Sequence, residues 1–169
     1  QTIKIDMALI KSISGIRGTI GGKAGDGLSP MDIVKFASAY GSWVLARSLE
    51  SNNKVTVVIG RDERISGEMV TNLVAGTLVG LGIHVIDLGL STTPTVEVAV
   101  TEEKANGGII ITASHNPKEW NALKLLNEKG EFLSGADGEE ILTIAESGDM
   151  KYATVGHIGS ITKNETYLQ

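Results

Sequence analysis

Residues 107–117 are GGIIITASHNP, an apolar run followed at once by a polar turn. The run Gly108–Thr112 is rich in β-branched side chains, which favour strands. It has no polar alternation, which is typical of a strand buried on both faces of a covered sheet. Pro117 closes the turn, because proline cannot continue a buried strand. The stretch therefore predicts a buried strand that delivers Ser114 to one edge of a sheet.

Strands and helices alternate on both sides of this stretch. β-Branched runs of strand length alternate with segments whose apolar residues recur at helical spacing. The predicted strands are Val55–Ile59, Ile83–Leu88, Gly108–Thr112 and Trp120–Leu126, and Ile10–Ile20 is expected to be an irregular strand or hairpin. The predicted helices run from Ser29-Pro30 to Ser51-Asn52-Asn53, from Ser66 to Gly80, from Thr95 to Lys104 and from Gly138 to Ala145. This order predicts an α/β fold, a three-layer α/β/α sandwich with a mostly parallel or mixed sheet of about four strands.

The 169 residues fit one domain and a short tail. We expect residues 1–150 to form that domain. Residues 151–169 have weak periodicity and several polar side chains, so we expect a linker or the start of another domain.

Composition excludes several classes of function. The chain has no cysteine, which rules out disulfides, thiolate metal sites and thiol nucleophiles. The net charge of −5 argues against a nucleic-acid partner, because phosphate backbones need a basic face. No run approaches 18 apolar residues, so no membrane span is expected. Residues 1–11 lack the apolar core of a signal peptide, and we expect a cytoplasmic protein.

Polar side chains follow each of the three central predicted strands. The clusters are Gly60–Arg64, Gly89–Pro94 and Ala113–Pro117. Ligands of α/β sheets bind at the carboxyl ends of the strands, so these loops are expected to converge on one rim.

Ser114 is the strongest candidate for chemistry. A serine on a tight loop after a buried strand can be a nucleophile or a phosphoryl carrier, but serine, asparagine and proline also simply form turns. The neighbouring His115 points to the opposite side of an extended chain, which disfavours a Ser–His catalytic pair. His115 is then an orienting hydrogen-bond donor or a satisfied polar residue. A serine hydrolase would also need an acid, and none stands at a usable spacing.

The basic residues near these loops each allow two interpretations. Lys124 is a general acid/base or a solvent-facing strand residue. Arg17 lies between Gly15 and Gly18, which let backbone approach a ligand, and its guanidinium suits phosphate. Arg61 and Arg64 either bind the same anion or form ion pairs with the neighbouring carboxylates of Asp62, Glu63 and Glu68.

Four blocks, in this order, resemble the α-D-phosphohexomutases, the family of phosphoglucomutases and phosphomannomutases. The blocks are Ser14-Gly-Ile-Arg17-Gly18, then Gly60-Arg61-Asp62 with Arg64, Ser66 and Gly67, then Asp87, Gly89, Thr93 and Pro94, and last Thr112-Ala-Ser-His-Asn-Pro117 with Asn121 and Lys124. Together they cover Leu9 to about Leu133, and they resemble the family's N-terminal domain I.

The resemblance implies a phosphoserine mechanism. Ser114 would donate a phosphoryl group to a hexose 1- or 6-phosphate and regain one from the bisphosphorylated sugar. Lys124 matches the general acid/base, and Arg17 matches an active-site arginine. His115 and Asn116 match residues that shape the phosphoserine loop, while Asn121, Arg61 and Arg64 fall in matching blocks and are expected to bind the substrate or that loop.

The resemblance also implies partners outside this chain. Mg²⁺ would bind the phosphate on Ser114 and an aspartate loop that this chain lacks, and a hexose 1,6-bisphosphate would act as activator. The remaining domains of the same protein would supply that loop and the sugar-reading loops, so the isolated domain is expected to be inactive. A non-catalytic sugar-phosphate-binding module on the same fold is the alternative.

One position departs from the family pattern. The family commonly has Asn-Gly before the apolar residue and lysine, whereas this chain has Asn121-Ala122. Alanine tolerates a positive φ poorly, so either this turn is not left-handed here or a subfamily variant is present.

Overall fold

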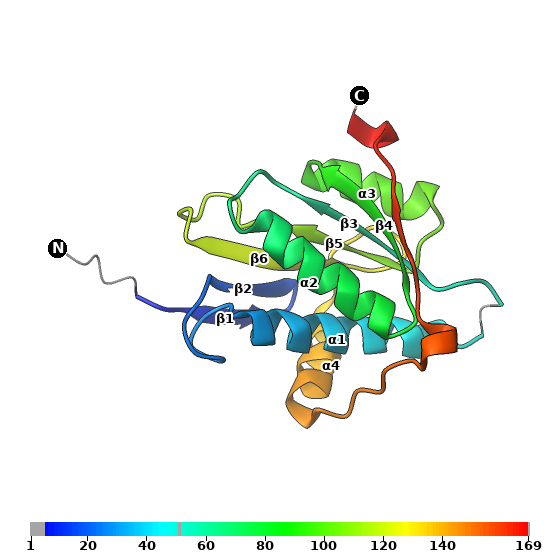
Figure 1. Ribbon diagram of the computed structural model, residues 1–169, viewed down its shortest axis with the longest axis horizontal. Coiled ribbons are helices and arrows are strands. Elements are labelled where there is room, and N and C mark those ends of the chain that lie inside the picture. Colours follow the sequence, from blue (N-terminus) through cyan, green and yellow to red (C-terminus); the bar gives the residue numbers. More distant parts are fainter. Residues whose placement is uncertain (1–5, 51, 169) are drawn as a thin grey trace.

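A mixed sheet of seven strands forms the centre of the described part of the chain, residues 6–50 and 52–168 of a computed structural model (Figure 1). The strand order is β1-β2-β6-β5-β3-β4-β7. The bounds are β1 (Leu9–Ser12), β2 (Gly15–Thr19), β3 (Thr56–Arg61), β4 (His84–Leu90), β5 (Gly107–Ile111), β6 (Trp120–Leu126) and β7 (Ile161–Lys163). The expectation of about four strands was wrong: β1 and β2, which form the hairpin expected over Ile10–Ile20, join the sheet, and β7 adds a seventh strand. Expectations for residues 1–5 and Ser51 lie outside the described part.

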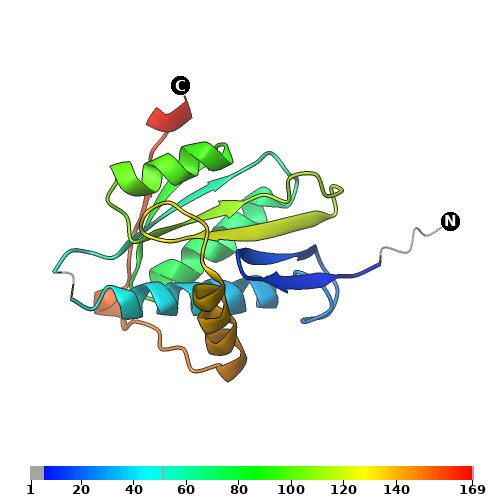
Figure 2. The ribbon, with the colours of Figure 1, turned by 180° about the vertical axis from the view of Figure 1, so that it is seen from behind.

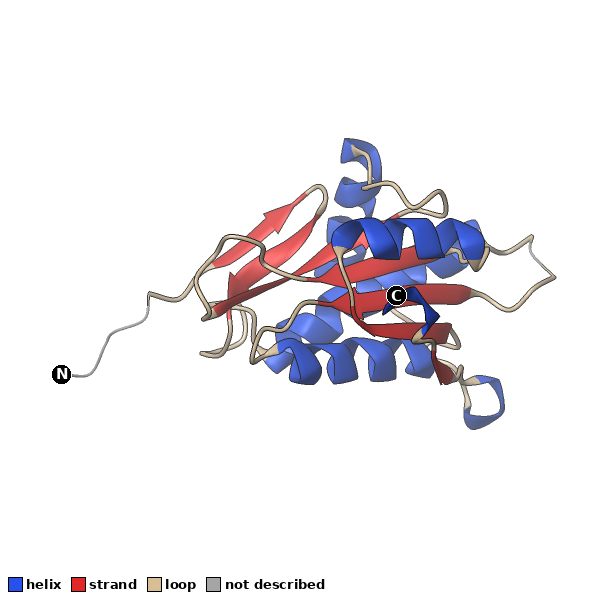
Figure 3. Cartoon of the chain, turned by 90° about the horizontal axis from the view of Figure 1, so that it is seen from above, coloured by secondary structure: helices blue, strands red, loops and turns tan. Residues whose placement is uncertain are grey.

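Helices cover both faces of this sheet. They are α1 (Pro30–Arg47), α2 (Gly67–Gly80), α3 (Thr93–Glu102) and α4 (Gly135–Ser147), with 3₁₀ turns at Val155–His157 and Thr166–Leu168. Helix α3 packs on one face, and α1 and α2 pack on the other, with α4 against α1 (Figures 2 and 3). The predicted three-layer α/β/α sandwich is therefore confirmed.

Local capping sets where the helices begin. Ser29 and Asp32 form a capping box before α1, with Pro30 in its first turn, so the helix begins where the sequence predicts. Helix α1 ends at Arg47, one turn before the expected Ser51–Asn53. Helix α3 begins at Thr93 because Thr92 caps it, which leaves Pro94 inside the first turn where its missing N–H costs nothing.

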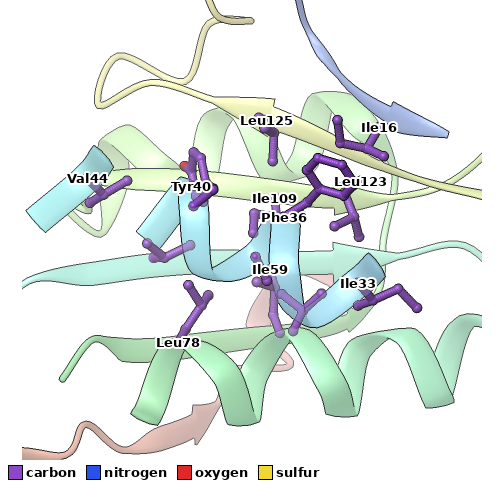
Figure 4. Close-up of a cluster of buried hydrophobic side chains, with 14 of the residues drawn as sticks. Ile16, Ile33, Phe36, Tyr40, Val44, Ile59, Leu78, Ile109, Leu123 and Leu125 are labelled. Carbon is purple, nitrogen blue, oxygen red and sulfur yellow. The ribbon is translucent and has the colours of Figure 1, made fainter. Parts of the chain in front are cut away.

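The larger core lies between α1 and the sheet (Figure 4). Side chains of α1 meet the aliphatic residues that the strands place on the same face, among them Phe36, Tyr40, Ile59, Ile109 and Leu123. Burying each such side chain stabilises the fold by about 1.5–3 kcal/mol. Strand β5 contributes to both layers, since Ile109 and Ile111 face α1 and Ile110 faces α3. A strand held on both faces gives the loop after it a rigid base.

The sheet combines two kinds of pairing. Strands β5, β3, β4 and β7 run parallel, whereas β1, β2 and β6 pair antiparallel, and β6 returns antiparallel to β5. Residues 151–169, interpreted as a linker or a domain start, contain β7, which pairs with β4 at the sheet edge. Across the described residues, no helix is long and apolar enough to cross a membrane.

Candidate active site

The loops after β3, β4 and β5 meet at one edge of the sheet. Parallel pairing of Arg61 with Ile111 brings the ends of β3 and β5 together, and the Asp62 N–H donates to the Ile111 carbonyl at 3.1 Å. The Ser91 N–H, in the loop after β4, donates to the Arg61 carbonyl at 2.9 Å. The predicted convergence on one rim is confirmed.

Ser114 lies on the loop after β5 in an uncommon backbone conformation. Its φ is +50°, in the left-handed region, where a non-glycine residue is strained. The Ser114 N–H donates to Thr112 Oγ1 at 3.1 Å, and the Asn116 N–H donates to the Ala113 carbonyl at 3.0 Å. The side chain is exposed. The loop thus presents the Ser114 hydroxyl to solvent in a fixed position.

Lys124 meets that hydroxyl from the neighbouring strand. Its Nζ donates to Ser114 Oγ at 2.8 Å. Lys124 lies on β6 opposite Ile110 of β5, so its side chain is on the α3 face. An ammonium group in contact with a serine oxygen can supply a proton to that oxygen when it becomes a leaving group. Among the described residues, Lys124 is the side chain that bonds to Ser114 Oγ.

Arg17 shares this face of the sheet. It pairs with Ala122 on β6, two residues from Lys124, and side chains at such diagonal positions of an antiparallel pair point the same way. The Arg17 side chain is exposed. A Cβ on Gly15 would collide with the Leu123 carbonyl, and one on Gly18 would lie 2.5 Å from the Ala8 carbonyl. The glycines beside Arg17 therefore make room for neighbouring strands of this chain.

Arg64 faces the loop of Ser114 from the turn before α2. Its Nε donates to Asp62 Oδ2 at 3.3 Å, which is the ion pair that the sequence allowed. Its two Nη atoms donate to backbone carbonyls of the loop, at Ser114, Asn116, Pro117 and Trp120, over 2.7–3.0 Å. Only 12% of the Arg64 side chain is exposed. Arg64 binds the loop rather than solvent.

The Arg61 side chain makes no hydrogen bond to the loop of Ser114 among those of the described residues. Its Nη1 donates to the Asp62 carbonyl at 3.1 Å. The side chain borders a cavity of about 350 Å³ that also includes Glu68, Asp87 and Lys163. Arg61 thus lines a cavity that does not include Ser114, and its side-chain hydrogen bond is to the neighbouring Asp62 carbonyl.

Two of the remaining predicted residues are at the surface and one is buried. His115 is exposed and Asn116 is half-buried, on the same loop as Ser114. Asn121 is 0% exposed. Its Nδ2 donates to Ser66 Oγ at 2.9 Å, and its Oδ1 accepts from the Ala122 N–H at 2.8 Å. Asn121 supports the start of β6 and α2 from within the protein.

Ala122 resolves the departure from the family pattern. The non-glycine residues with positive φ in the described part are Lys104 and Ser114. Ala122 instead lies within β6, paired with Arg17. Extended backbone suits alanine, so no left-handed turn is needed before Lys124.

A complete magnesium site does not fit the residues present. Within residues 6–50 and 52–168, no group of three His, Asp or Glu side chains stands close enough to hold a metal ion. Mg²⁺ prefers several oxygen ligands in near-octahedral geometry. The Ser114 hydroxyl alone does not provide them.

A family of known proteins matches this chain over most of its length. The family described as phosphoglucomutase/phosphomannomutase, alpha/beta/alpha domain I, matches residues 9–152. A phosphoglucomutase/phosphomannomutase of Thermococcus kodakarensis is 36% identical over 150 residues, which cover 88% of this chain and 32% of that protein. A phosphoglucosamine mutase of Levilactobacillus brevis is also 36% identical, over 87% of this chain and 32% of its own length.

Solved structures share the fold. A putative phosphomannomutase of Thermus thermophilus superimposes with a TM-score of 0.74 at 25% identity, over 93% of this chain and 33% of that chain. This chain thus spans about a third of the length of the relatives it matches. It belongs to the phosphoglucomutase/phosphomannomutase family and corresponds to the α/β/α domain I of that family.

Proposed function

We propose that the protein carrying this domain is a phosphohexomutase that interconverts hexose 1-phosphate and hexose 6-phosphate through a phosphoserine at Ser114. The observation that supports this most is the contact of Lys124 Nζ with Ser114 Oγ at 2.8 Å. It joins an exposed hydroxyl to a proton donor at the rim where α/β proteins bind ligands. Membership of a family of sugar-phosphate mutases supports the reaction class.

The proposed step is a phosphoryl transfer. The bond between Ser114 Oγ and phosphorus breaks while a bond forms between phosphorus and a hydroxyl oxygen of the hexose monophosphate. Lys124 gives a proton to Oγ, and the proton lost by the sugar hydroxyl returns to the Lys124 amine. The bisphosphorylated sugar then turns over and returns its other phosphoryl group to Ser114.

The exposed side chains around Ser114 fit supporting roles. Arg17 lies on the Lys124 face of the sheet, where a guanidinium can pair with phosphate oxygens. His115 and Asn116 lie on the serine loop itself and would shape it around the phosphoryl group. Because no metal cluster fits the described residues, Mg²⁺ would need oxygen ligands from outside this chain in addition to the Ser114 phosphate.

Two other functions are weaker. A serine hydrolase of the Ser–His–Asp kind needs a histidine base, and among the described residues the partner of Ser114 Oγ is a lysine. The matching family and relatives are mutases, which also favours phosphoryl transfer over hydrolysis. A non-catalytic module that only binds sugar phosphates would keep Arg17 but would not need a proton donor at Ser114. A cytoplasmic location stays a prediction.

Turnover of a substrate panel tests the proposal. The full-length protein would be supplied with Mg²⁺, a catalytic amount of hexose 1,6-bisphosphate, and glucose, mannose or glucosamine phosphate. We expect turnover of at least one substrate, abolished by Ser114→Ala. Ser147→Ala is the matched control, since Ser147 is exposed at the end of α4 and its hydroxyl bonds to local backbone groups, the Ile144 carbonyl and the Asp149 N–H. Full activity of Ser114→Ala would remove the serine as carrier.

A further inference from the structure

The guanidinium of Arg64 has a hydrogen-bond acceptor for each of its five N–H groups. Nε bonds to Asp62 Oδ2, Nη1 bonds to the carbonyls of Pro117 and Trp120, and Nη2 bonds to the carbonyls of Ser114 and Asn116. Five donors in a fixed planar fork are the full capacity of an arginine. In this geometry Arg64 has no N–H left for a phosphate group.

The backbone of Arg64 is held by hydrogen bonds as well as its guanidinium. The Arg64 N–H donates to Asp62 Oδ1 at 3.2 Å, and the Arg64 carbonyl accepts from the Gly67 N–H at 2.8 Å, at the start of α2. Asp62 follows β3 directly and is tied to β5 through the Ile111 carbonyl. Arg64 therefore links the loop of Ser114 to both the sheet and a helix.

A second path runs from the same carboxylate to the Ser114 backbone. Thr112 Oγ1 donates to Asp62 Oδ2 at 2.6 Å and accepts from the Ser114 N–H at 3.1 Å. Ser114 is thus held through its N–H by Thr112 and through its carbonyl by Arg64. Both its flanking peptide groups are fixed, which is what a φ of +50° requires if it is to persist in a non-glycine residue.

We infer that Arg64 is a positioning residue that, with Asp62 and Thr112, holds the Ser114 loop in its left-handed conformation and so keeps the serine hydroxyl on Lys124. This inference rests on the function proposed above and adds to it the residues that orient Ser114, the phosphoryl carrier. Lysine cannot replace Arg64, because one ammonium nitrogen has three donors at a single point and cannot reach four separated carbonyls.

The test compares Arg64→Lys with wild type in the full-length protein. Hydrogen exchange of the loop amides, residues 114–116 and 118–120, reports the loop alone. Turnover reports its effect on the reaction. We expect loop exchange to rise about tenfold or more, kcat to fall about 100-fold, and KM to stay within about threefold, because misplacement of a reacting group acts on the transition state.

Arg47→Lys is the matched control. Arg47 lies on α1, where its guanidinium pairs with the exposed carboxylate of Glu128 and the half-buried carboxylate of Asp137. It should leave both loop exchange and kcat unchanged. If Arg64→Lys does not fold, Thr112→Val removes the second path with little change of shape, and should raise loop exchange and lower kcat in the same sense.

Each outcome decides the inference. Wild-type loop exchange in Arg64→Lys with kcat lost would mean that Arg64 acts directly on the substrate, and would overturn a positioning role. Increased exchange with unchanged kcat would overturn it as well. A wild-type protein without any turnover would count against the proposed function, while the exchange data would still decide whether Arg64 holds the loop.

Discussion

Replacing Tyr40 by phenylalanine tests how the core holds the strand that carries Ser114. Tyr40 is 0% exposed, and its hydroxyl lies between β5 and β6. It accepts from the Gly108 N–H at 2.9 Å and donates to the Leu126 carbonyl at 2.7 Å, with the Gly108 carbonyl at 3.1 Å. Gly107 leaves room for it, because a Cβ there would collide with the hydroxyl oxygen.

The cost of Tyr40→Phe follows from these bonds. Phenylalanine keeps the ring and leaves one buried N–H and one buried carbonyl without their partner. Each such group costs about 1–3 kcal/mol, and partial relaxation of the strands should bring the sum to about 2–4 kcal/mol. For a domain of this size the melting temperature should fall by roughly 5–15 °C.

Urea unfolding of the 169-residue chain, followed by circular dichroism, measures this cost. Tyr167→Phe is the matched control, since the residue is only half-buried and its hydroxyl bonds to the part-exposed Glu103 carboxylate, which also accepts from Asn164 Nδ2. The control should lose at most about 0.5 kcal/mol. A free energy of unfolding for Tyr40→Phe within about 0.5 kcal/mol of wild type would refute the argument. It would mean that another group replaces the hydrogen bonds of the Tyr40 hydroxyl to Gly108 and Leu126.

The same residue gives a pH signature. Burial raises the pKa of the Tyr40 hydroxyl above its ordinary value of 10.0. A raised folded pKa means that the stabilisation is complete below about pH 10, where the unfolded tyrosine is also neutral, and is lost as pH rises toward the folded pKa. The free energy of unfolding should therefore fall more steeply above pH 10 in wild type than in Tyr40→Phe. Parallel curves would contradict this.

Three further predictions concern the site. Lys124→Met should lower kcat by about 10²–10⁴-fold in the full-length protein, while Lys54→Met, at an exposed lysine, serves as control. Equal kcat values for the two variants in a steady-state assay would refute the role of Lys124 as proton donor. Gly15→Ala should destabilise the β2–β6 pairing through its collision with the Leu123 carbonyl, by more than about 1 kcal/mol in urea unfolding. The isolated 169-residue chain should show no mutase turnover, and robust turnover would disprove that metal ligands from elsewhere are needed.

Strands with strong apolar patterns could be predicted from the sequence, and weak ones could not. Trp120–Leu126 was predicted with its observed bounds, because a run of aliphatic residues between turn signals is a strong pattern. Strand β7, Ile161–Lys163, has three exposed residues and pairs only at the sheet edge. Nothing in three such residues distinguishes a strand from a loop, so the sheet was predicted too small.

The same contrast holds at the site. Ser114 and Lys124 were predicted, and the structure brings their side chains together. The positive φ of Ser114 has no sequence signal, because glycine normally marks that conformation. The role of Thr112 was missed, and the sequence left Arg64 open between binding an anion and forming an ion pair with a neighbouring carboxylate. Only the fold shows which acceptors lie within reach of a guanidinium, since the Ser114 loop is about 50 residues away in sequence.

Phosphopeptide mass analysis of the full-length protein tests the central claim most directly. The protein would be incubated with Mg²⁺ and a hexose 1,6-bisphosphate, digested, and analysed before and after addition of a hexose monophosphate. The account predicts one phosphoryl group on Ser114 that disappears when the monophosphate is added, and no such group in Ser114→Ala. A folded protein that never carries phosphate on Ser114 would contradict the phosphoserine mechanism and favour a module that only binds sugar phosphates.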